Sequence, residues 1–261
     1  MSDIAIPAGA GIYEKIRERE NMKKAVAIIL AGGTGERMNG TTPKQFLELG
    51  GRPVIVRTLE QFERNALISR IVVVCHKDHV KELDGLVKQN GIKKVCTIVR
   101  GGKTRQESSY IGVRSCPPDT ELVLIHDAVR PFVDERIIKD TLSAAMESGA
   151  AGPVIDAADT IIIKRGDFIE GIPDREDVKR MQTPQGFRYG TILKAHQWAL
   201  KNGIKDSTDD CGLVLGTGAP VKAVNGSAGN IKITDRADMF LAERLVSPGK
   251  GRTGKKGDIG G

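Results

Sequence analysis

The chain has 261 residues, 39% of them hydrophobic and 4% aromatic, with a formal net charge of +7. This length and apolar content suit one large α/β domain with an appended element. Because no apolar stretch approaches the roughly 20 residues of a membrane-spanning helix and no signal peptide is evident, we expect a cytoplasmic protein without a membrane partner.

The positive charge does not indicate nucleic-acid binding. The last fourteen residues, 248–261, hold four lysines or arginines against a single aspartate, and six of the fourteen are glycine. Such a segment is typical of a flexible tail whose charge need not belong to the folded body. The low aromatic content also disfavours a surface that stacks bases. We therefore expect no nucleic-acid partner and favour a small anionic substrate.

The chain divides into three parts. Residues 1–22 form an N-terminal extension with a possible helix over Tyr13–Asn21, residues 23–247 form the domain, and 248–261 form the Gly/Lys-rich tail. The four cysteines, Cys75, Cys96, Cys116 and Cys211, are widely separated and form no Cys-x-x-Cys pair, so we expect reduced thiols in or near the core.

Apolar strand-like runs alternate with amphipathic helical runs through the first half of the domain. The expected strand and helix pairs are Ala25–Leu30 with Pro53–Arg64, Arg70–Cys75 with Asp78–Gln89, Lys93–Val99 with Thr104–Arg114, and Glu121–His126 with Asp134–Ser148. Repeated βα units predict a mostly parallel, Rossmann-like sheet with helices on both faces. Ligands of such sheets bind beyond the carboxyl ends of the strands.

A glycine-rich loop follows the first expected strand. Gly32, Gly33 and Gly35 can adopt conformations in which successive backbone N–H groups surround an anion, and Arg37 and Lys44 follow as cations. The string is neither a P-loop nor a Gly-x-Gly-x-x-Gly fingerprint. A tight turn without a ligand is the alternative. The two cations favour a triphosphate site in which Arg37 and Lys44 neutralise charge during group transfer.

Two more polar loops are expected at the same edge of the sheet. Residues 101–105, Gly-Gly-Lys-Thr-Arg, precede Ser108, and Asp127 ends the fourth expected strand. The Asp127 carboxylate would hold Mg²⁺ beside phosphate oxygens, with helix capping or pairing with Arg130 as the alternatives. We assign no chemical role to His126.

The pattern changes after Ala157. Ile161–Lys164 and Phe168–Ile172, joined through residues 165–167, predict a β-hairpin arm within about 157–178. Because an isolated hairpin cannot bury apolar residues by itself, we expect it to pair with a second subunit in a homodimer. Further on, we expect helices over Gly190–Lys201, from Ser207–Asp210 onward and over Arg236–Val246, and a strand over Val221–Val224. Lys232 is the single cation of the loop before the last helix.

Together these motifs resemble the cytidylyltransferases that act on polyol phosphates, the IspD/TarI family. The resemblance covers roughly residues 24–246 and includes the string of residues 30–38, Pro43–Gln45, Gly101 to Ser108, His126–Pro131, Thr183–Gln185 and Asn230–Thr234. It implies a CTP-dependent nucleotidyltransferase in which a substrate phosphate attacks the α-phosphorus of CTP and releases pyrophosphate.

The resemblance also implies residue roles. Arg37 and Lys44 would stabilise the transition state. The nucleotide would contact Ala31, Gly32, Gly33, Gly102, Ser108, Asp127, Ala128 and Lys232, and the polyol phosphate would contact Thr160, Arg175, Thr183, Thr208 and Lys232. Thr160 and Arg175, on or after the arm, would reach the neighbouring subunit's site.

Two acceptors are compatible with these motifs. Residues 183–189, 195–196, 208–210, 220–222 and 230–232 resemble the enzymes that use 2-C-methyl-D-erythritol 4-phosphate, whereas residues 43–50, 156–160 and 172–175 resemble those that use ribitol 5-phosphate. We expect the methylerythritol phosphate and keep ribitol 5-phosphate as the alternative.

Two other classes fit less well. An oxidoreductase on such a sheet would end its second strand with an acidic residue that binds ribose, but that strand ends in Cys75 and His76. A non-catalytic scaffold would be expected to lose Arg37 or Lys44, and both are present.

Overall fold

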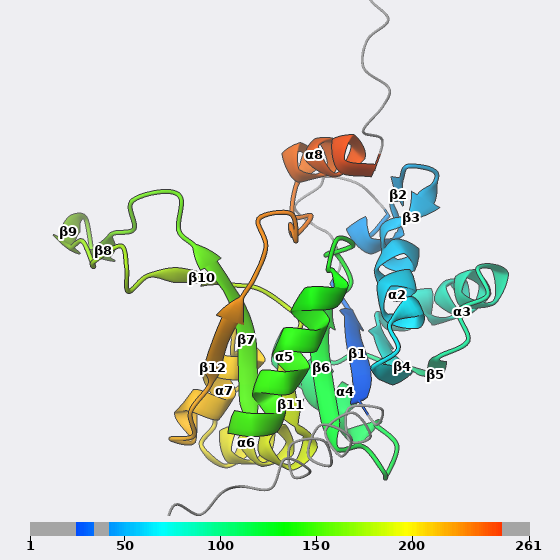
Figure 1. The fold of residues 1–261 in the computed structure, drawn as a ribbon, viewed down its shortest axis with the longest axis horizontal. Helices are drawn as coiled ribbons and strands as arrows, with labels where there is room; N and C mark the ends of the chain where they lie inside the picture. The colour runs from blue at the N-terminus through cyan, green and yellow to red at the C-terminus, as the bar shows by residue number, and fades with distance from the viewer. Residues whose placement is uncertain (1–24, 34–41, 247–261) are drawn as a thin grey trace, which may run out of the picture.

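A mixed eight-stranded sheet forms the centre of the fold (Figure 1). The computed structural model describes residues 25–33 and 42–246, so the predictions for Tyr13–Asn21, residues 1–22, Arg37 and the tail lie outside the described residues. The strand order is β10-β7-β11-β6-β1-β4-β5, with β12 paired to β7. The strands are β1 (Ala25–Ala31), β4 (Ile68–Cys75), β5 (Val95–Arg100), β6 (Leu122–Asp127), β7 (Ala150–Asp156), β10 (Lys179–Met181), β11 (Gln185–Arg188) and β12 (Lys222–Asn225).

The sheet is mostly parallel, as the sequence predicts. β1 pairs in parallel with β4 and β6, β4 with β5, and β12 with β7. β11 runs antiparallel to both β6 and β7, and β10 runs antiparallel to β7. β11 therefore lies between two strands that run in the same direction. The series of βα units expected from the sequence ends at β6.

Helices cover both faces of the sheet because the central strands are apolar on both sides. Along β1, Ala27 and Ile29 face one core, and Val26 and Ile28 face the other. The helices are α2 (Val54–Arg64), α3 (Val80–Gln89), α4 (Arg105–Arg114), α5 (Glu135–Ser148), α6 (Tyr189–Lys201), α7 (Asp210–Gly216) and α8 (Arg236–Val246). The first core contains residues of α2, α3 and α5, and the second contains residues of α4, α6 and α7.

Local capping sets several helix boundaries. The side chains of Thr104, Asp134 and Asp209 accept hydrogen bonds from backbone N–H groups in the first turns of α4, α5 and α7. Gly149 ends α5 with a φ of +89°, a conformation that favours glycine, and the chain enters β7 directly afterwards. The expected helix over Asp78–Gln89 instead begins with a 3₁₀ turn at Lys77–His79 that leads into α3.

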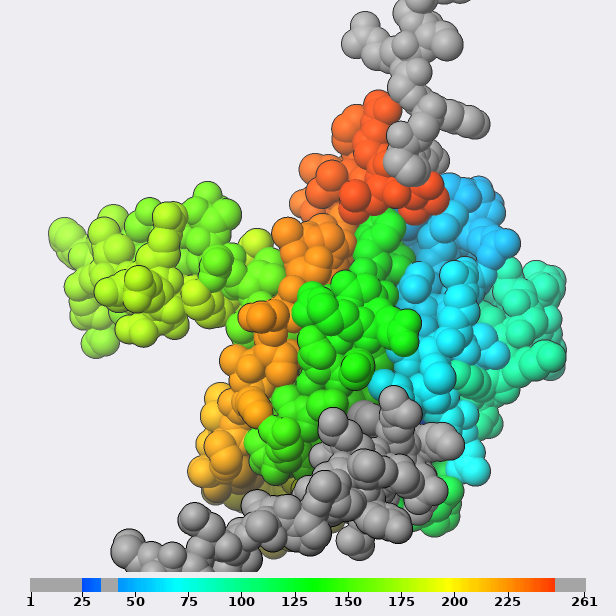
Figure 2. Space-filling model, viewed as in Figure 1, coloured from blue at the N-terminus to red at the C-terminus, as the bar shows by residue number. Residues whose placement is uncertain are grey.

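The expected hairpin is present as β8 (Ile163–Arg165) and β9 (Phe168–Gly171), which pair antiparallel. It projects from the body of the molecule (Figures 1 and 2), and Ile163, Phe168 and Ile169 are exposed on it. A second small hairpin, β2 (Glu48–Leu49) with β3 (Arg52–Pro53), packs near α8.

The thiols differ in part from the prediction. All four cysteines are free, and Cys75 and Cys211 are buried, but Cys96 on the edge strand β5 is exposed. Among the described residues, no helix is both long and apolar enough to cross a membrane.

Candidate functional site

The polar loops that follow β1, β5 and β6 meet in one pocket, as expected for the carboxyl ends of parallel strands. Its volume is about 380 Å³. The residues that line it are Leu30, Ala31, Gly32, Gly33, Lys44, Gln45, Gly102, Lys103, Thr104, Arg105, Ser108, Asp127, Val129 and Lys232. The structure thus brings together eight residues that the sequence resemblance assigned to catalysis or to the nucleotide: Ala31, Gly32, Gly33, Lys44, Gly102, Ser108, Asp127 and Lys232.

The Gln45 side chain, which was not among the predicted site residues, fixes the start of the glycine loop. Gln45 is buried, and its Nε2 donates to the backbone carbonyls of Ala31 at 2.8 Å and of Gly33 at 2.9 Å. These two bonds hold the backbone of residues 31–33, the part of the loop that the structure describes, at the wall of the pocket. Gln45 follows Lys44 directly, so the same short turn also places the catalytic lysine predicted from the sequence.

Lys44 forms a hydrogen bond with a residue just before the last helix, α8. Its Nζ donates to the backbone carbonyl of Thr234 at 3.3 Å. Thr234 follows Lys232 by two positions, so the turn that carries Lys44 and the loop that carries Lys232 are joined across the pocket. Two cations from opposite ends of the sequence therefore face the same space.

The second glycine loop is shaped by α4. The Ser108 hydroxyl accepts from the Gly102 N–H at 3.1 Å, and Glu107 accepts from the Lys103 N–H at 2.7 Å. A Cβ on Gly102 would lie 2.3 Å from Cγ of Glu107, so no larger residue fits there without a shift. The glycine is therefore required by the close approach of the loop to its own helix.

Asp127 is surrounded by positive charge. Its Oδ2 lies 2.9 Å from Lys232 Nζ and 3.7 Å from Arg130 Nε, and its Oδ1 lies 3.8 Å from Arg105 Nε. Burial alone would raise the pKa of this carboxyl, but Lys232, Arg105 and Arg130 outweigh it and hold the pKa well below its usual range. Asp127 is ionised at neutral pH, and the predicted pairing with Arg130 is present.

Behind Asp127, Thr183 and His126 fix the backbone. The Thr183 hydroxyl accepts from the Asp127 N–H at 3.2 Å and lies 2.9 Å from His126 Nδ1, and His126 Nε2 lies 3.0 Å from the Arg130 carbonyl. Because a carbonyl only accepts, Nε2 carries the proton and Nδ1 accepts from Thr183. Burial lowers the His126 pKa to about 4, so the ring is neutral and structural.

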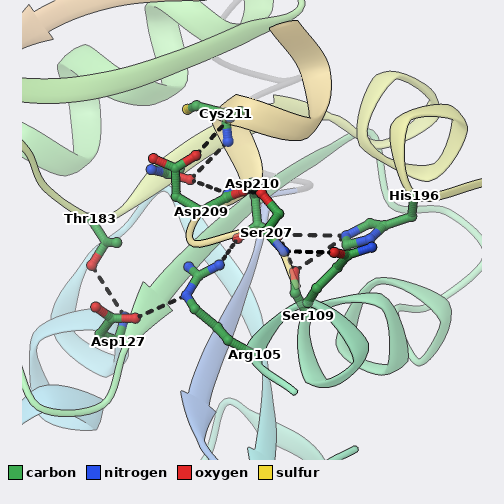
Figure 3. A network of polar contacts seen from close by, with 12 residues as sticks. Arg105, Ser109, Asp127, Thr183, His196, Ser207, Asp209, Asp210 and Cys211 are labelled. Atoms are coloured by element: carbon green, nitrogen blue, oxygen red, sulfur yellow. Dashed lines mark hydrogen bonds and ion pairs between the residues drawn. The ribbon is translucent and has the colours of Figure 1, made fainter. Parts of the chain in front are cut away.

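A buried network joins the pocket to α7 (Figure 3). Arg105 Nη1 lies 2.8 Å from Asp210 Oδ2, and the Ser109 hydroxyl donates to Asp210 Oδ1. Burial would raise the Asp210 pKa, but Arg105 and the neighbouring donors lower it. From the sequence, Asp210 was expected only at the start of a helix, and Arg105 stood in a motif without an assigned role.

The other predicted residues lie outside the pocket lining. Thr183 is buried behind Asp127, and Ala128 is buried at the end of β6. Thr208 is exposed just before α7. Thr160 is exposed at the base of the arm, and Arg175 donates across that base to the Ala158 carbonyl at 2.9 Å. Within one chain, Thr183 and Ala128 therefore lie directly behind the pocket wall, whereas Thr160, Arg175 and Thr208 are not part of its lining.

The donor set fits a magnesium ion that accompanies a nucleotide. No group of three or more His, Cys, Asp or Glu side chains that could hold a metal occurs in the part of the chain that the structure describes. Asp127 supplies one ionised carboxylate at the pocket wall, and Mg²⁺ is commonly bound by one or two carboxylates together with substrate phosphates and water. Asp127 is therefore the residue that would hold it.

Comparison with known proteins identifies the family. Residues 25–247 match the family model IspD, 2-C-methyl-D-erythritol 4-phosphate cytidylyltransferase. The chain belongs to the IspD family. This match confirms the resemblance found in the sequence and excludes the dehydrogenase alternative.

Curated relatives and solved structures agree with the IspD assignment. The 2-C-methyl-D-erythritol 4-phosphate cytidylyltransferase of Geobacillus kaustophilus is 42% identical over 85% of this chain and 96% of its own length, and the Clostridium botulinum (strain Langeland) protein of the same name is 40% identical over 86% and 98%. A crystal structure of 4-diphosphocytidyl-2C-methyl-D-erythritol synthase from Anaerococcus prevotii is 31% identical, with a TM-score of 0.75 over 85% of this chain and 98% of that one.

Proposed function

We propose that the protein transfers CMP from CTP to 2-C-methyl-D-erythritol 4-phosphate, giving 4-diphosphocytidyl-2-C-methyl-D-erythritol and pyrophosphate. The observation that carries this proposal is the match of residues 25–247 to the IspD family, together with relatives of that name at about 40% identity. The same relatives favour this acceptor over ribitol 5-phosphate.

The pocket suits a transfer that depends on positioning and charge. An oxygen of the acceptor phosphate attacks the α-phosphorus of CTP, and the bond from that phosphorus to the oxygen bridging the α- and β-phosphates breaks as pyrophosphate leaves. Negative charge builds up on the reacting phosphoryl group, so fixed cations and N–H donors lower the barrier. Lys44 and Arg37 would supply the cations, and the N–H groups of the glycine loop would hold the triphosphate.

The remaining residues in and behind the pocket wall divide between the two substrates. Ala31, Gly32, Gly33, Gly102, Ser108, Asp127 and Ala128 would surround the nucleotide. Lys232, paired with Asp127 at 2.9 Å, would lie near both the phosphates of CTP and the acceptor phosphate. A Mg²⁺ ion held by Asp127 would neutralise phosphate charge when bound.

We further propose a homodimer formed through the arm. Its support is the exposed apolar surface of β8 and β9, where Phe168 is 81% exposed and Ile169 is 63% exposed. A two-stranded hairpin is marginally stable alone, and pairing with a second copy would bury these residues. Thr160 and Arg175 would then contact the acceptor in the partner's site, with Thr183 and Thr208 contributing from the other subunit.

The test is pyrophosphate release by the purified protein with CTP and Mg²⁺. Methylerythritol phosphate and ribitol 5-phosphate are supplied in parallel, and UTP replaces CTP in a control. We expect release that requires CTP and strongly prefers methylerythritol phosphate. Preference for ribitol 5-phosphate would reject the proposed acceptor, and no release with either would reject the proposed reaction.

A further inference from the structure

Arg105 is shared between two carboxylates whose positions are fixed independently. Its Nη1 lies 2.8 Å from Asp210, and its Nε lies 3.8 Å from Oδ1 of Asp127. Figure 3 shows the guanidinium between the two groups. The first distance is that of a charge-assisted hydrogen bond, and the second is too long for one. Asp210 therefore holds the guanidinium closely, and Asp127 does not.

The backbone and side chain of Asp210 are both anchored. Gln185 Oε1 accepts from the backbone N–H groups of Asp210 and Cys211 at 3.0 and 3.1 Å. The Ser109 hydroxyl donates to the side chain, and His196 Nε2 lies 3.5 Å from Oδ1. The Asp210 side chain is fully buried. Asp210 thus cannot follow Arg105 if the guanidinium moves.

The position of Arg105 determines what Oδ1 of Asp127 can bind. Lys232 and Arg130 both approach Oδ2, whereas Oδ1 has only the distant contact with Arg105, at 3.8 Å, among the ion pairs of the described residues. If the charge of Asp210 were lost, Asp127 would become the nearest carboxylate for the guanidinium. Closure of that 3.8 Å gap would place a cation on the oxygen that faces away from Lys232.

We propose that Asp210 is a positioning residue for Asp127 that acts through Arg105: it draws the guanidinium away from Oδ1 and leaves that oxygen free for the divalent cation that accompanies CTP. The inference rests on the proposed function for the identity of the nucleotide. A buried ion pair is often no more stabilising than an apolar replacement, so a role in positioning explains its presence better than stability does.

The experiment measures Mn²⁺ binding to the protein–CTP complex without acceptor, from the loss of the free-ion electron paramagnetic resonance signal. We expect Asp210→Asn to weaken Mn²⁺ binding about tenfold, the effect typical of groups that orient a metal ligand. The double variant Arg105→Gln/Asp210→Asn should restore affinity to near that of the wild type, because no guanidinium remains to occupy Oδ1. Asp119→Asn, which breaks an exposed pair with Arg70, is the matched control.

Two results would overturn the proposal. One is unchanged Mn²⁺ affinity in folded Asp210→Asn, and the other is a double variant that binds Mn²⁺ as weakly as the single variant. If Asp210→Asn does not fold, the double variant still tests the proposal, because it removes both buried charges and leaves no guanidinium at Oδ1, so weak Mn²⁺ binding by it would overturn the proposal. Wild-type protein that binds Mn²⁺ and CTP without releasing pyrophosphate would reject the proposed function and leave this comparison intact.

Discussion

Asp238 holds Thr234 at the start of α8, with its Oδ2 accepting from the Thr234 N–H at 2.7 Å and from the Thr234 hydroxyl. Asp235 completes a reciprocal capping arrangement by accepting from the Asp238 N–H at 2.9 Å. Because the Thr234 carbonyl accepts from Lys44, this cap also fixes the orientation of a lysine near the other end of the chain.

Replacing Asp238 by Ala should therefore affect both stability and turnover. We expect a loss of about 1 kcal/mol in the free energy of unfolding, as for other helix caps, and a several-fold lower kcat. The matched control is Asn65→Ala, which removes a side-chain bond to the Leu67 N–H before β4. Urea unfolding and pyrophosphate release measure the two effects. Equal activity in the two variants would contradict a role for the cap in placing Lys44.

Lys44→Ala and Arg37→Ala should each lower kcat about 10²- to 10³-fold, the range found when one charge-stabilising donor is removed. Their melting temperatures should stay near that of the wild type, because the proposed role concerns charge in the transition state. Lys88→Ala on α3, which breaks an exposed pair with Asp84, should leave kcat unchanged. Near-normal turnover in both the Lys44 and Arg37 variants would reject their assignment.

Phe168→Ser should convert the proposed dimer to monomers, because this side chain is the most exposed apolar group of the arm. Sedimentation velocity measures the mass, and kcat should fall since Thr160 and Arg175 would no longer reach a partner's site. Leu200→Ser on α6 alters an apolar side chain that is 58% exposed outside the arm and serves as the control. A wild-type protein that sediments as a monomer would already contradict the arm's role.

Stability should fall as the pH is lowered from about 6.5 to about 4, in part through His126. Burial lowers the pKa of His126 to about 4, whereas the unfolded chain takes up this proton near pH 6.5. The unfolded state thus binds more protons in this window, so the free energy of unfolding decreases toward low pH, by up to about 3 kcal/mol from this group.

Urea unfolding of wild-type protein and His126→Gln at pH 7.5, 6.0 and 5.0 measures that contribution. The variant should show a shallower dependence on pH. The control is His79→Gln, on the turn before α3. An unchanged slope in His126→Gln would show that other groups cause the dependence.

The sequence predicted the elements whose signals are local. β1 is an uninterrupted apolar run, and α4 and α5 begin at capping residues that stand in the predicted ranges. The hairpin was predicted from two apolar runs around Gly166, which has a φ of +58°. By contrast, β7 was not predicted, because Ala150–Asp156 contains two alanines, Gly152 and Pro153, which are residues with low strand propensity. This segment forms a strand because it pairs with β10, β11 and β12.

The residues of the candidate site also divide into those that a local sequence signal predicted and those that only the fold shows. Lys44 and Asp127 stand in short strings whose residue types already suggest phosphate and metal chemistry. The pairing of Arg105 with Asp210 joins positions 105 residues apart, and no spacing rule relates them. Gln45 was missed because a glutamine after a lysine carries no signal of its own, and only the fold shows that it holds the glycine loop.

The place of β11 between β6 and β7 sets an order for assembly during synthesis. Strands β1, β4, β5 and β6 can associate once the chain reaches Asp127, but β7 has no partner in that half of the sheet. The edge of β6 stays open until residues 185–188 emerge, and Thr183, which holds the Asp127 backbone, arrives just before them. The pocket wall is therefore completed late, after the nascent chain has passed the arm.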